Sequence, residues 1–269
     1  MSDGVRRNAR RWVWQRVWPK VAAIALGLAG WELVVLSGWR PRYVLPGPLE
    51  VLHALATSIA SGDAVQAASI TMARAVFGYA IALIVGTMLG LVLARIRVLR
   101  IAMGSLLSGV QSMPSVAWFP LAILLFQLSE SAIISVVVLG AAPSIANGLL
   151  SSIDHVPPVL VRAGRVLGAK GFALYRLVYV PAALPGFVSG LKQGWAFAWR
   201  SLMAGELLVI IGQRPSLGVR LQYAREFSDA IGLVAWMLIV LAIGIIVDSV
   251  VFGAIEYVVR SRRGLTEAR

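Results

Sequence analysis

The residues that could do chemistry gather in one basic stretch between two long hydrophobic blocks. Residues 162–181 (RAGRVLGAKGFALYRLVYVP) are cationic, interrupted by glycines and still partly apolar. Just ahead of them, Pro157 and Pro158 favour the start of a helix, because proline suits the first helical turn. Apolar residues then recur at helical spacing: Val159, Leu160, Ala163, Val166 and Leu167. This pattern predicts a short helix that docks on a partner subunit.

The docking segment is broken by glycines. Arg162 and Arg165 are three residues apart and therefore share a face away from the apolar residues. Gly168 and Gly171 interrupt the helix, and an apolar helical pattern then resumes. That second pattern ends at two prolines: Pro181 and Pro185. We expect two short helices at an angle, resting partly on the rest of the chain and partly free for another subunit, because short helices gain little stability from their own hydrogen bonds.

No enzymatic centre is visible in the sequence. There is no cysteine, which excludes a thiolate nucleophile and a thiolate metal site. His53 and His155 have no second histidine or acidic cluster at ligand spacing, so no metal site is expected. No nucleophile–base pair is evident, and no phosphate loop of the G-x-x-x-x-G-K-[ST] type occurs. The sequence therefore favours a protein that is not an enzyme.

The elements that must position the docking segment are membrane helices. Of the 269 residues, 59% are hydrophobic and 14% are charged, with a mean hydropathy of +0.82. Ordinary soluble chains are roughly 45–50% apolar and about 25% charged. The net charge of +13 could suggest nucleic acid, but the basic residues flank apolar blocks, which is typical of a membrane protein. No cleavage site closes the first apolar stretch, which indicates a retained span rather than a signal peptide.

The apolar stretches predict an all-α, polytopic membrane protein with about six transmembrane helices. They are residues 21–37, 75–94, 101–129, 131–153, 177–212 and 230–259. With the N-terminus inside, seventeen arginines and lysines lie on the cytoplasmic side and five outside, which predicts N-in and C-in ends. The expected domains are a basic cytoplasmic segment at 1–20, one transmembrane domain at 21–259 with the docking loop at about 154–181, and a basic cytoplasmic tail at 260–269.

Segments flanking the spans carry further predictions. Residues 45–61 begin with prolines and predict a short amphipathic helix on the outer membrane surface or against the bundle. Its apolar residues at helical spacing are Leu49, Leu52, Leu55, Ala56 and Ile59. Residues 212–229 predict a polar outer loop long enough to shape a vestibule. Beside the N-terminal arginines, three tryptophans predict an interfacial anchor: Trp12, Trp14 and Trp18.

Broken positions in the spans are candidates for a translocation pathway. Ser112, Pro114 and Ser115 lie in the third span, where prolines free backbone carbonyls that must face protein or water. A pathway-lining kink and a simple packing kink stay equally open. Trp195 and Trp199 in the fifth span likewise either line a pathway or pack.

Charged residues inside the spans also leave alternatives open, because such charges face a cavity or a partner. Arg200 could attract an anionic solute such as a sulfonate. The favoured interpretation is a structural pair with an acid of another span, Glu32 or Asp248. Lys192 is expected to extend to the cytoplasmic interface. Asp248 and Glu256 are expected to face the bundle or its inner rim in structural roles. Glu206 lies further out along the fifth span than Arg200, and the two are poorly placed to pair on one helix because they are six residues apart.

Several of these residues resemble a known motif. Ala163-Gly164, Gly168 and Val178-Tyr179-Val180-Pro181 match the spacing of the cytoplasmic-loop motif of binding-protein-dependent ABC importer permeases. That motif reads Glu-Ala-Ala, three residues, Gly, nine residues, Ile-x-Leu-Pro. The stretches 45–48, 112–118 and 181–200 are similar to the nitrate/sulfonate/taurine branch, so the resemblance covers about residues 20–260. Arg162 stands where the motif has its acidic residue, and an arginine there could meet acidic residues on the partner.

The resemblance implies the permease subunit of a type I importer in the bacterial inner (plasma) membrane. Two copies of the chain would pair, two ATPase subunits would bind ATP and magnesium, and an extracytoplasmic binding protein would deliver a small, anionic solute. The implied docking site is a coupling loop between spans four and five: Arg162, Ala163, Gly164, Arg165, Val166, Leu167, Gly168 and Ala169. The candidate pathway residues, which follow from the residue types in the spans, are Ser112, Pro114, Ser115, Trp199 and Arg200. Closure of the ATPase dimer would move the coupling loop as a lever.

Two other classes remain as alternatives. An ion-coupled secondary transporter would need titratable residues deep in several spans and internal repeats, and neither is evident. A membrane enzyme or assembly factor would need a clustered polar site within the bundle. The solute stays open among nitrate, sulfonates, taurine, bicarbonate and small heterocycles.

Overall fold

The chain folds into helices alone in the part that the computed structural model describes, which is the backbone of residues 3–211 and 214–261. Side chains are described at residues 18, 19 and from 21 onward within these ranges. By length and composition, four helical stretches here could cross a membrane: Asp63–Arg95, Glu130–Asp154, Gly171–Leu208 and Ala230–Ser261. A bent pair, Arg97–Ser112 and Ser115–Phe126, would make a fifth. The basic tail residues 262–269 and the side chains of Trp12 and Trp14 lie outside the described residues.

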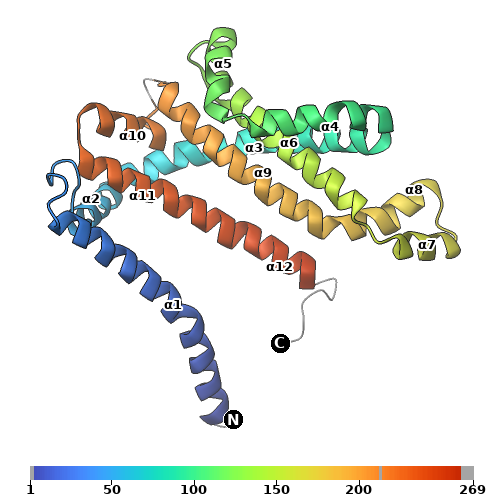
Figure 1. Ribbon diagram of the computed structural model, residues 1–269, viewed down its shortest axis with the longest axis horizontal. Helices are drawn as coiled ribbons and strands as arrows, with labels where there is room; N and C mark the ends of the chain where they lie inside the picture. Colours follow the sequence, from blue (N-terminus) through green and yellow to red (C-terminus); the bar gives the residue numbers. More distant parts are fainter. Residues whose placement is uncertain (1–2, 212–213, 262–269) are drawn as a thin grey trace.

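Three long helices build the centre of the molecule (Figure 1): α3 (Asp63–Arg95), α6 (Glu130–Asp154) and α9 (Val180–Leu208). A Cβ built on Gly148 of α6 would lie 2.5 Å from the Cα of Gly190 on α9. A Cβ on Gly86 of α3 would lie 2.6 Å from the carbonyl oxygen of Ala142 on α6. Small residues are the usual means by which membrane helices approach closely, because lipid supplies no hydrophobic drive between helices. The sequence thus places α6 between α3 and α9.

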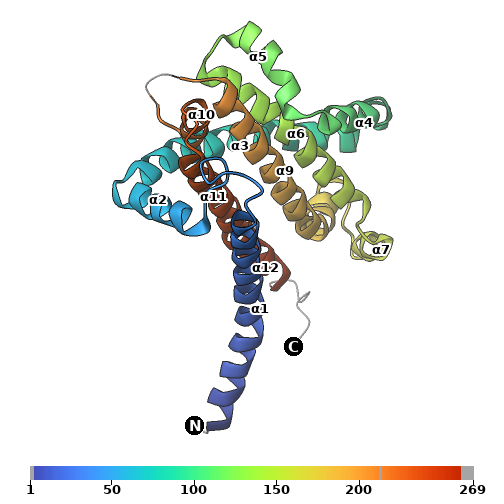
Figure 2. The ribbon, with the colours of Figure 1, turned by 60° about the vertical axis from the view of Figure 1, so that its left-hand side comes forward.

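Shorter helices gather at two opposite ends of this centre. Helices α2 (Pro48–Ala60) and α10 (Leu217–Glu226) lie at one end, and α7 (Pro158–Val166) lies at the other (Figures 1 and 2). Helix α11 (Ala230–Ile246) runs from the α10 end and continues through the wide turn η3 (Val247–Phe252) into α12 (Gly253–Ser261). Helix α1 (Asp3–Leu36) projects from the rest, and its apolar part, Val21–Leu36, is shorter than the four membrane-spanning candidates.

The third predicted span is broken, as its prolines indicated. Helix α4 (Arg97–Ser112) ends at Met113, which is extended, and Pro114 starts a 3-10 turn, η1 (Ser115–Trp118). Helix α5 (Phe119–Phe126) follows, and the two arms are bent by 101°. Proline cannot donate the backbone hydrogen bond that would continue the helix, which explains the break. The geometry is that of a broken span or a re-entrant loop.

The docking segment differs from expectation in its second half. The predicted second short helix does not stand alone, because α8 (Gly171–Leu174), the wide turn η2 (Tyr175–Tyr179) and α9 form a single helical stretch, Gly171–Leu208. Pro181 and Pro185 do not end it. Pro181 follows directly on the wide turn η2, where the regular hydrogen-bond pattern of the helix is already interrupted, so its missing N–H is tolerated. Pro185 lies inside α9.

Both segments that were predicted to lie outside contain a helix. Helix α2 confirms the amphipathic helix expected at 45–61, but its buried positions are Pro48 and Val51, whereas Leu49 and Ile59 are exposed. The segment expected to be a polar loop at 212–229 holds α10, whose Leu217 is completely buried. That expectation was wrong because polar residues outnumber the apolar ones there, while the few apolar residues recur at helical spacing.

Candidate coupling and translocation sites

Helix α7 is short and has defined ends. Pro157 and Pro158 form its first turn, as predicted. At the other end Gly168 has a φ of +86°, a left-handed conformation that favours glycine. The N–H of Gly168 donates to the carbonyl of Arg165 (3.0 Å), and the N–H of Ala169 donates to the carbonyl of Gly164 (2.9 Å). These two bonds close the helix in a glycine cap, so the chain turns sharply into α8.

The underside of α7 rests on the helix that follows it. A Cβ on Gly164 would lie 2.6 Å from Val178 Cγ2 and 3.2 Å from Leu174 Cδ1, so only glycine fits this contact. Val161 and Leu174 are buried together in a small cluster with Val156. This contact explains why glycine replaces the second alanine of the motif. It also fixes which face of α7 stays free.

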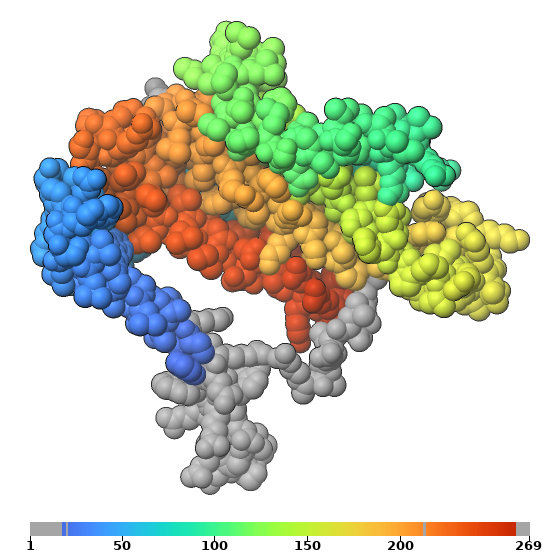
Figure 3. All heavy atoms as spheres, in the orientation of Figure 1, coloured from blue at the N-terminus to red at the C-terminus, as the bar shows by residue number. Residues whose placement is uncertain are grey.

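The free face of α7 is apolar. Val166 and Leu167 are each 86% exposed, and Val159 is 59% exposed. Phe172, just after the glycine turn, is 79% exposed. Figure 3 shows this segment projecting at one end of the molecule. Large apolar side chains on a helix that stands away from the bundle are typical of a protein interaction site. We call this surface (Val159, Leu160, Ala163, Val166 and Leu167) the outer face of α7.

The arginines of α7 lie on a different side. Arg162 and Arg165 line a cavity of about 1290 Å³ between α7, the ends of α3 and α6, and the start of the α9 stretch. Pro158 and Val161 share that side of the helix. The two arginines therefore border the cavity, while the apolar residues face outward. The sequence predicted two faces, but not that the basic one borders a cavity within the same chain.

The candidate pathway residues are placed in two groups. Ser112, Pro114 and Ser115 lie at the break between α4 and α5, where the Ser112 hydroxyl donates to the carbonyl of Gly109 (2.8 Å). Trp199 lies on α9 and stacks on Trp195, with ring centroids 6.3 Å apart. Within the described part of the chain, no hydrogen bond or ion pair joins the first group to the second.

Arg200 does not make the structural pair that was favoured for it. Its Nε donates to the carbonyl of Ala196 (3.1 Å), and its guanidinium lies 4.8 Å from the centre of the Phe197 ring. The side chain is exposed, and among the described residues no carboxylate lies within ion-pair distance. Asp248 instead pairs with Lys192 (3.2 Å), so Lys192 does not simply extend to the interface. Arg200 lies on the exposed face of α9, which is compatible with a role in a pathway and with contact with another subunit.

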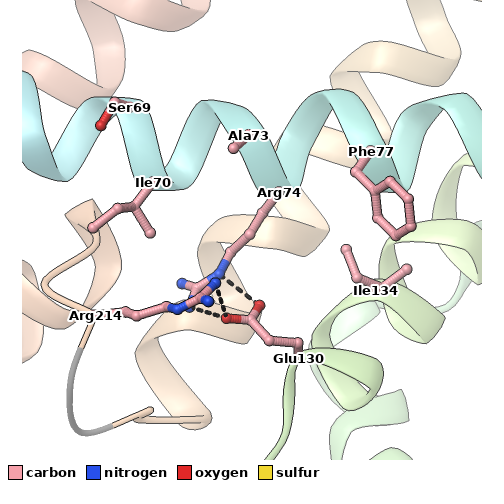
Figure 4. A pocket seen from close by; sticks show the side chains of 8 residues that line it. All are labelled: Ser69, Ile70, Ala73, Arg74, Phe77, Glu130, Ile134 and Arg214. Carbon is pink, nitrogen blue, oxygen red and sulfur yellow. Dashed lines mark hydrogen bonds and ion pairs between the residues drawn. The ribbon is translucent and has the colours of Figure 1, made fainter.

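Sequence analysis did not predict a buried polar network at the α10 end, which is shown in part in Figure 4. Arg74 of α3 donates from Nε and Nη2 to both carboxylate oxygens of Glu130, each at 2.7 Å. Its Nη1 donates to Glu206 of α9 at 2.8 Å. Arg214 also reaches Glu130, at 3.3 Å. Arg74 is 6% exposed and Glu206 is completely buried.

Glu206 also holds the start of α10. Its second oxygen accepts from the backbone N–H of Gly218 (3.0 Å) and from the Thr71 hydroxyl (2.9 Å). Thr71 in turn accepts from the N–H of Leu217 (3.0 Å). The first N–H groups of a helix lack partners within the helix, and negative charge is favourable beside them. Residues of α3 and α9 thus supply the cap for α10.

A signal for this network was present in the sequence. Helices alternate in direction across a membrane, so Arg74 near the start of the second span meets Glu130 at the start of the fourth. Glu206 near the end of the fifth span falls at the same level. One arginine and two carboxylates at one depth predict a paired cluster, because unpaired charges there are costly.

In its described residues the chain is all-helical, with four helical stretches that could cross a membrane and a short projecting helix, α7. In agreement, the family model described as "Binding-protein-dependent transport system inner membrane component" matches residues 82–264. The chain is 31% identical over 224 residues to the riboflavin transport system permease protein RibX of Chloroflexus aurantiacus, covering 83% of this chain and 82% of that protein. It is 29% identical over 221 residues to the putative aliphatic sulfonates transport permease protein SsuC of Escherichia coli, covering 82% and 83%.

A solved structure supports the fold. The chain matches the structure described as "Crystal structure of an amino acid ABC transporter with histidines" with a TM-score of 0.59 at 16% identity. The match covers 77% of this chain and 97% of that chain. The protein belongs to the family of binding-protein-dependent ABC transporter permeases. It is therefore a multi-pass inner-membrane subunit, not itself an enzyme, that works with an ATPase and a binding protein.

Proposed function

We propose that the chain couples ATP hydrolysis by separate ATPase subunits to import of a small, anionic solute. The coupling loop, Arg162 to Ala169, is the docking site, and its outer face enters a groove on the ATPase. ATP and magnesium are bound by that partner. Movement of α7 is passed to the spans, which alternate between inward-open and outward-open states.

The observation that carries this proposal is the outer face of α7. Val166 and Leu167 are far more exposed than Val161 on the same helix, at 86% against 9%. The helix is held by its underside and by the glycine cap, so it keeps its shape without a partner. Central, well-packed apolar side chains dominate the binding energy of protein interfaces. A rigid short helix with free apolar side chains is therefore suited to transmit motion from a bound partner.

The same proposal fixes the arrangement in the membrane. The α7 end is cytoplasmic and the α10 end faces the binding protein, with six spans and both termini inside. In this arrangement Val21–Leu36 is the first span and the bent α4–α5 pair is the third. Two copies of the chain pair, and each carries one ATPase subunit on its coupling loop.

Substitution of Leu167 tests the docking site. Leu167→Asp places a charge on the outer face, and we expect the affinity of the purified permease for its ATPase to fall by about 30-fold or more. Phe227→Asp is the matched control, because Phe227 is also apolar and 79% exposed but follows α10 at the opposite end. Equal losses for both variants, or no loss for Leu167→Asp, would contradict the docking site.

Exposure of Arg200 supports an anionic solute. Its guanidinium has no carboxylate partner among the described residues and lies on the exposed face of α9. We expect ATP-driven uptake of an alkanesulfonate, taurine or nitrate in vesicles, reduced about tenfold by Arg200→Gln as one lost charge contact. Arg225→Gln, an exposed arginine at the end of α10, is the control. Uptake of riboflavin with no uptake of the anions would overturn this assignment.

A further inference from the structure

The cavity behind α7 has an unusual charge balance. Four arginines line it, and the only carboxylate among its lining residues is Asp154. Arg100 donates two hydrogen bonds to Asp154, so that carboxylate is already neutralised. Among the residues whose side chains are described, no carboxylate pairs with the other three: Arg95, Arg162 and Arg165. The cavity therefore carries an excess of positive charge that the described chain does not balance.

The cavity is also graded from basic to apolar. Arg95 lies at the end of α3 and Thr87 lies eight residues earlier, which is about 12 Å along the helix. Between them Leu91 and Val92 line the wall, 54% and 46% exposed. On the opposite wall the lining continues along α9 to Phe187. One end is thus cationic, and the walls that lead away from it are apolar and open.

From the unbalanced positive charge and the apolar walls we infer that the cavity between α7, α3 and α9 is a binding site for an anionic phospholipid. The phosphate lies among Arg95, Arg162 and Arg165, and the acyl chains follow the apolar walls. Basic pockets between membrane helices on the cytoplasmic side are suited to anionic headgroups. The ATPase does not fit this cavity, because a water-soluble partner would have to reach along α3 into a membrane-spanning stretch.

The inference rests on the proposed function in one respect, the placement of α7 at the cytoplasmic surface. It adds a consequence for that function. Arg162, which replaces the acidic residue of the family motif, turns away from the outer face of α7 and toward the lipid. A lipid bound there would fill the space behind α7 and restrict the movement of α7 relative to the bundle while the ATPase is bound to the outer face of α7.

The test is lipid binding by the full-length purified permease, without ATPase. Native mass spectrometry follows titration with phosphatidylglycerol and with phosphatidylcholine of the same acyl chains. We expect phosphatidylglycerol to bind at least about tenfold more tightly, and Arg95→Gln/Arg165→Gln to weaken it roughly 30-fold, since each arginine contributes about fivefold. Arg97→Gln/Arg176→Gln removes two arginines at the same end that do not line the cavity, and should change little. If the first double variant fails to fold, Arg95→Gln alone replaces it, because Arg95 is exposed.

The outcomes separate the possibilities. No preference for phosphatidylglycerol, or equal weakening by both double variants, would overturn the site. So would full displacement of phosphatidylglycerol by millimolar inorganic phosphate, which would mark a site for free phosphate. The lipid titration contains no ATPase, so it does not depend on docking. If Leu167→Asp abolishes ATPase binding but keeps the preference for phosphatidylglycerol, the lipid site is supported independently of the docking site. If the permease shows no preference for phosphatidylglycerol but binds the ATPase normally, the lipid site is overturned and the docking site is not.

Discussion

The α10 end and the α7 end of the molecule differ in how far their side chains find partners within the chain. At the α10 end, Arg74, Glu206 and Glu130 satisfy one another and close the start of α10, and the most deeply placed of them are shielded from solvent. At the α7 end, apolar side chains face outward and arginines border an open cavity. The mutually bonded charges of Arg74, Glu130 and Glu206 have a structural role. A region whose groups lack partners is where other molecules bind.

The largest effect on stability should come from Glu206. Glu206→Ala leaves Nη1 of Arg74 and the N–H of Gly218 buried without a partner, and we expect a loss of about 3–5 kcal/mol in the free energy of unfolding. Denaturant titration of the purified chain in mixed micelles measures this. Glu226→Ala on the exposed side of α10 is the control. A small loss at Glu206 would mean that the two ends differ less than their contacts indicate.

A smaller effect is expected where α6 crosses α9. Gly190→Ala places a methyl group against Gly148, and relieving that overlap should cost about 1–3 kcal/mol. Gly104→Ala in α4 meets nothing within 4 Å, so it should stabilise by about 0.5–1 kcal/mol through helix propensity. The same titration compares the two. Opposite signs are expected, and equal signs would contradict the close crossing.

The smallest effect on stability is expected on the outer face of α7. Leu167→Ala removes an exposed side chain and should change the free energy of unfolding by less than about 0.5 kcal/mol. Transport-coupled ATP hydrolysis by the reconstituted complex should nevertheless fall. Gly168→Pro should also lower transport-coupled ATP hydrolysis, because proline cannot adopt the positive φ of this turn. A destabilised Leu167→Ala protein with normal coupling would reverse the comparison between the two ends.

Much of the α7 end could be predicted from the sequence. Proline at the start, glycine at the end and apolar residues at helical spacing are local signals, and each is found where expected in the structure. The underside contact of Gly164 could not be predicted, since it depends on how α7 folds back on Val178. The continuity of α8 with α9 was also missed, because the wide turn η2 lets the helix run past Pro181.

The α10 end was predicted less well for a physical reason. Arg74 and Glu206 are distant in the chain, and only the packing of α3 against α9 brings them together. The segment 212–229 that contains α10 has more polar than apolar residues, and Thr71 and Glu206 from distant helices cap the first N–H groups of α10. Long-range pairing of this kind leaves no local pattern. The depth of each charge within its span was the one usable signal.

The most direct test of the coupling role is the accessibility of one position on α7. The chain has no cysteine, so Leu167→Cys provides a single thiol on the outer face of α7, and Phe227→Cys provides one at the opposite end. We predict that a membrane-impermeant maleimide labels Leu167→Cys from the cytoplasmic side and that bound ATPase slows this labelling at least about tenfold, as burial in an interface requires. Phe227→Cys should be labelled from the outside at a rate that the ATPase does not change. Labelling of Leu167→Cys from the outside, or at the same rate with ATPase bound, would contradict the account.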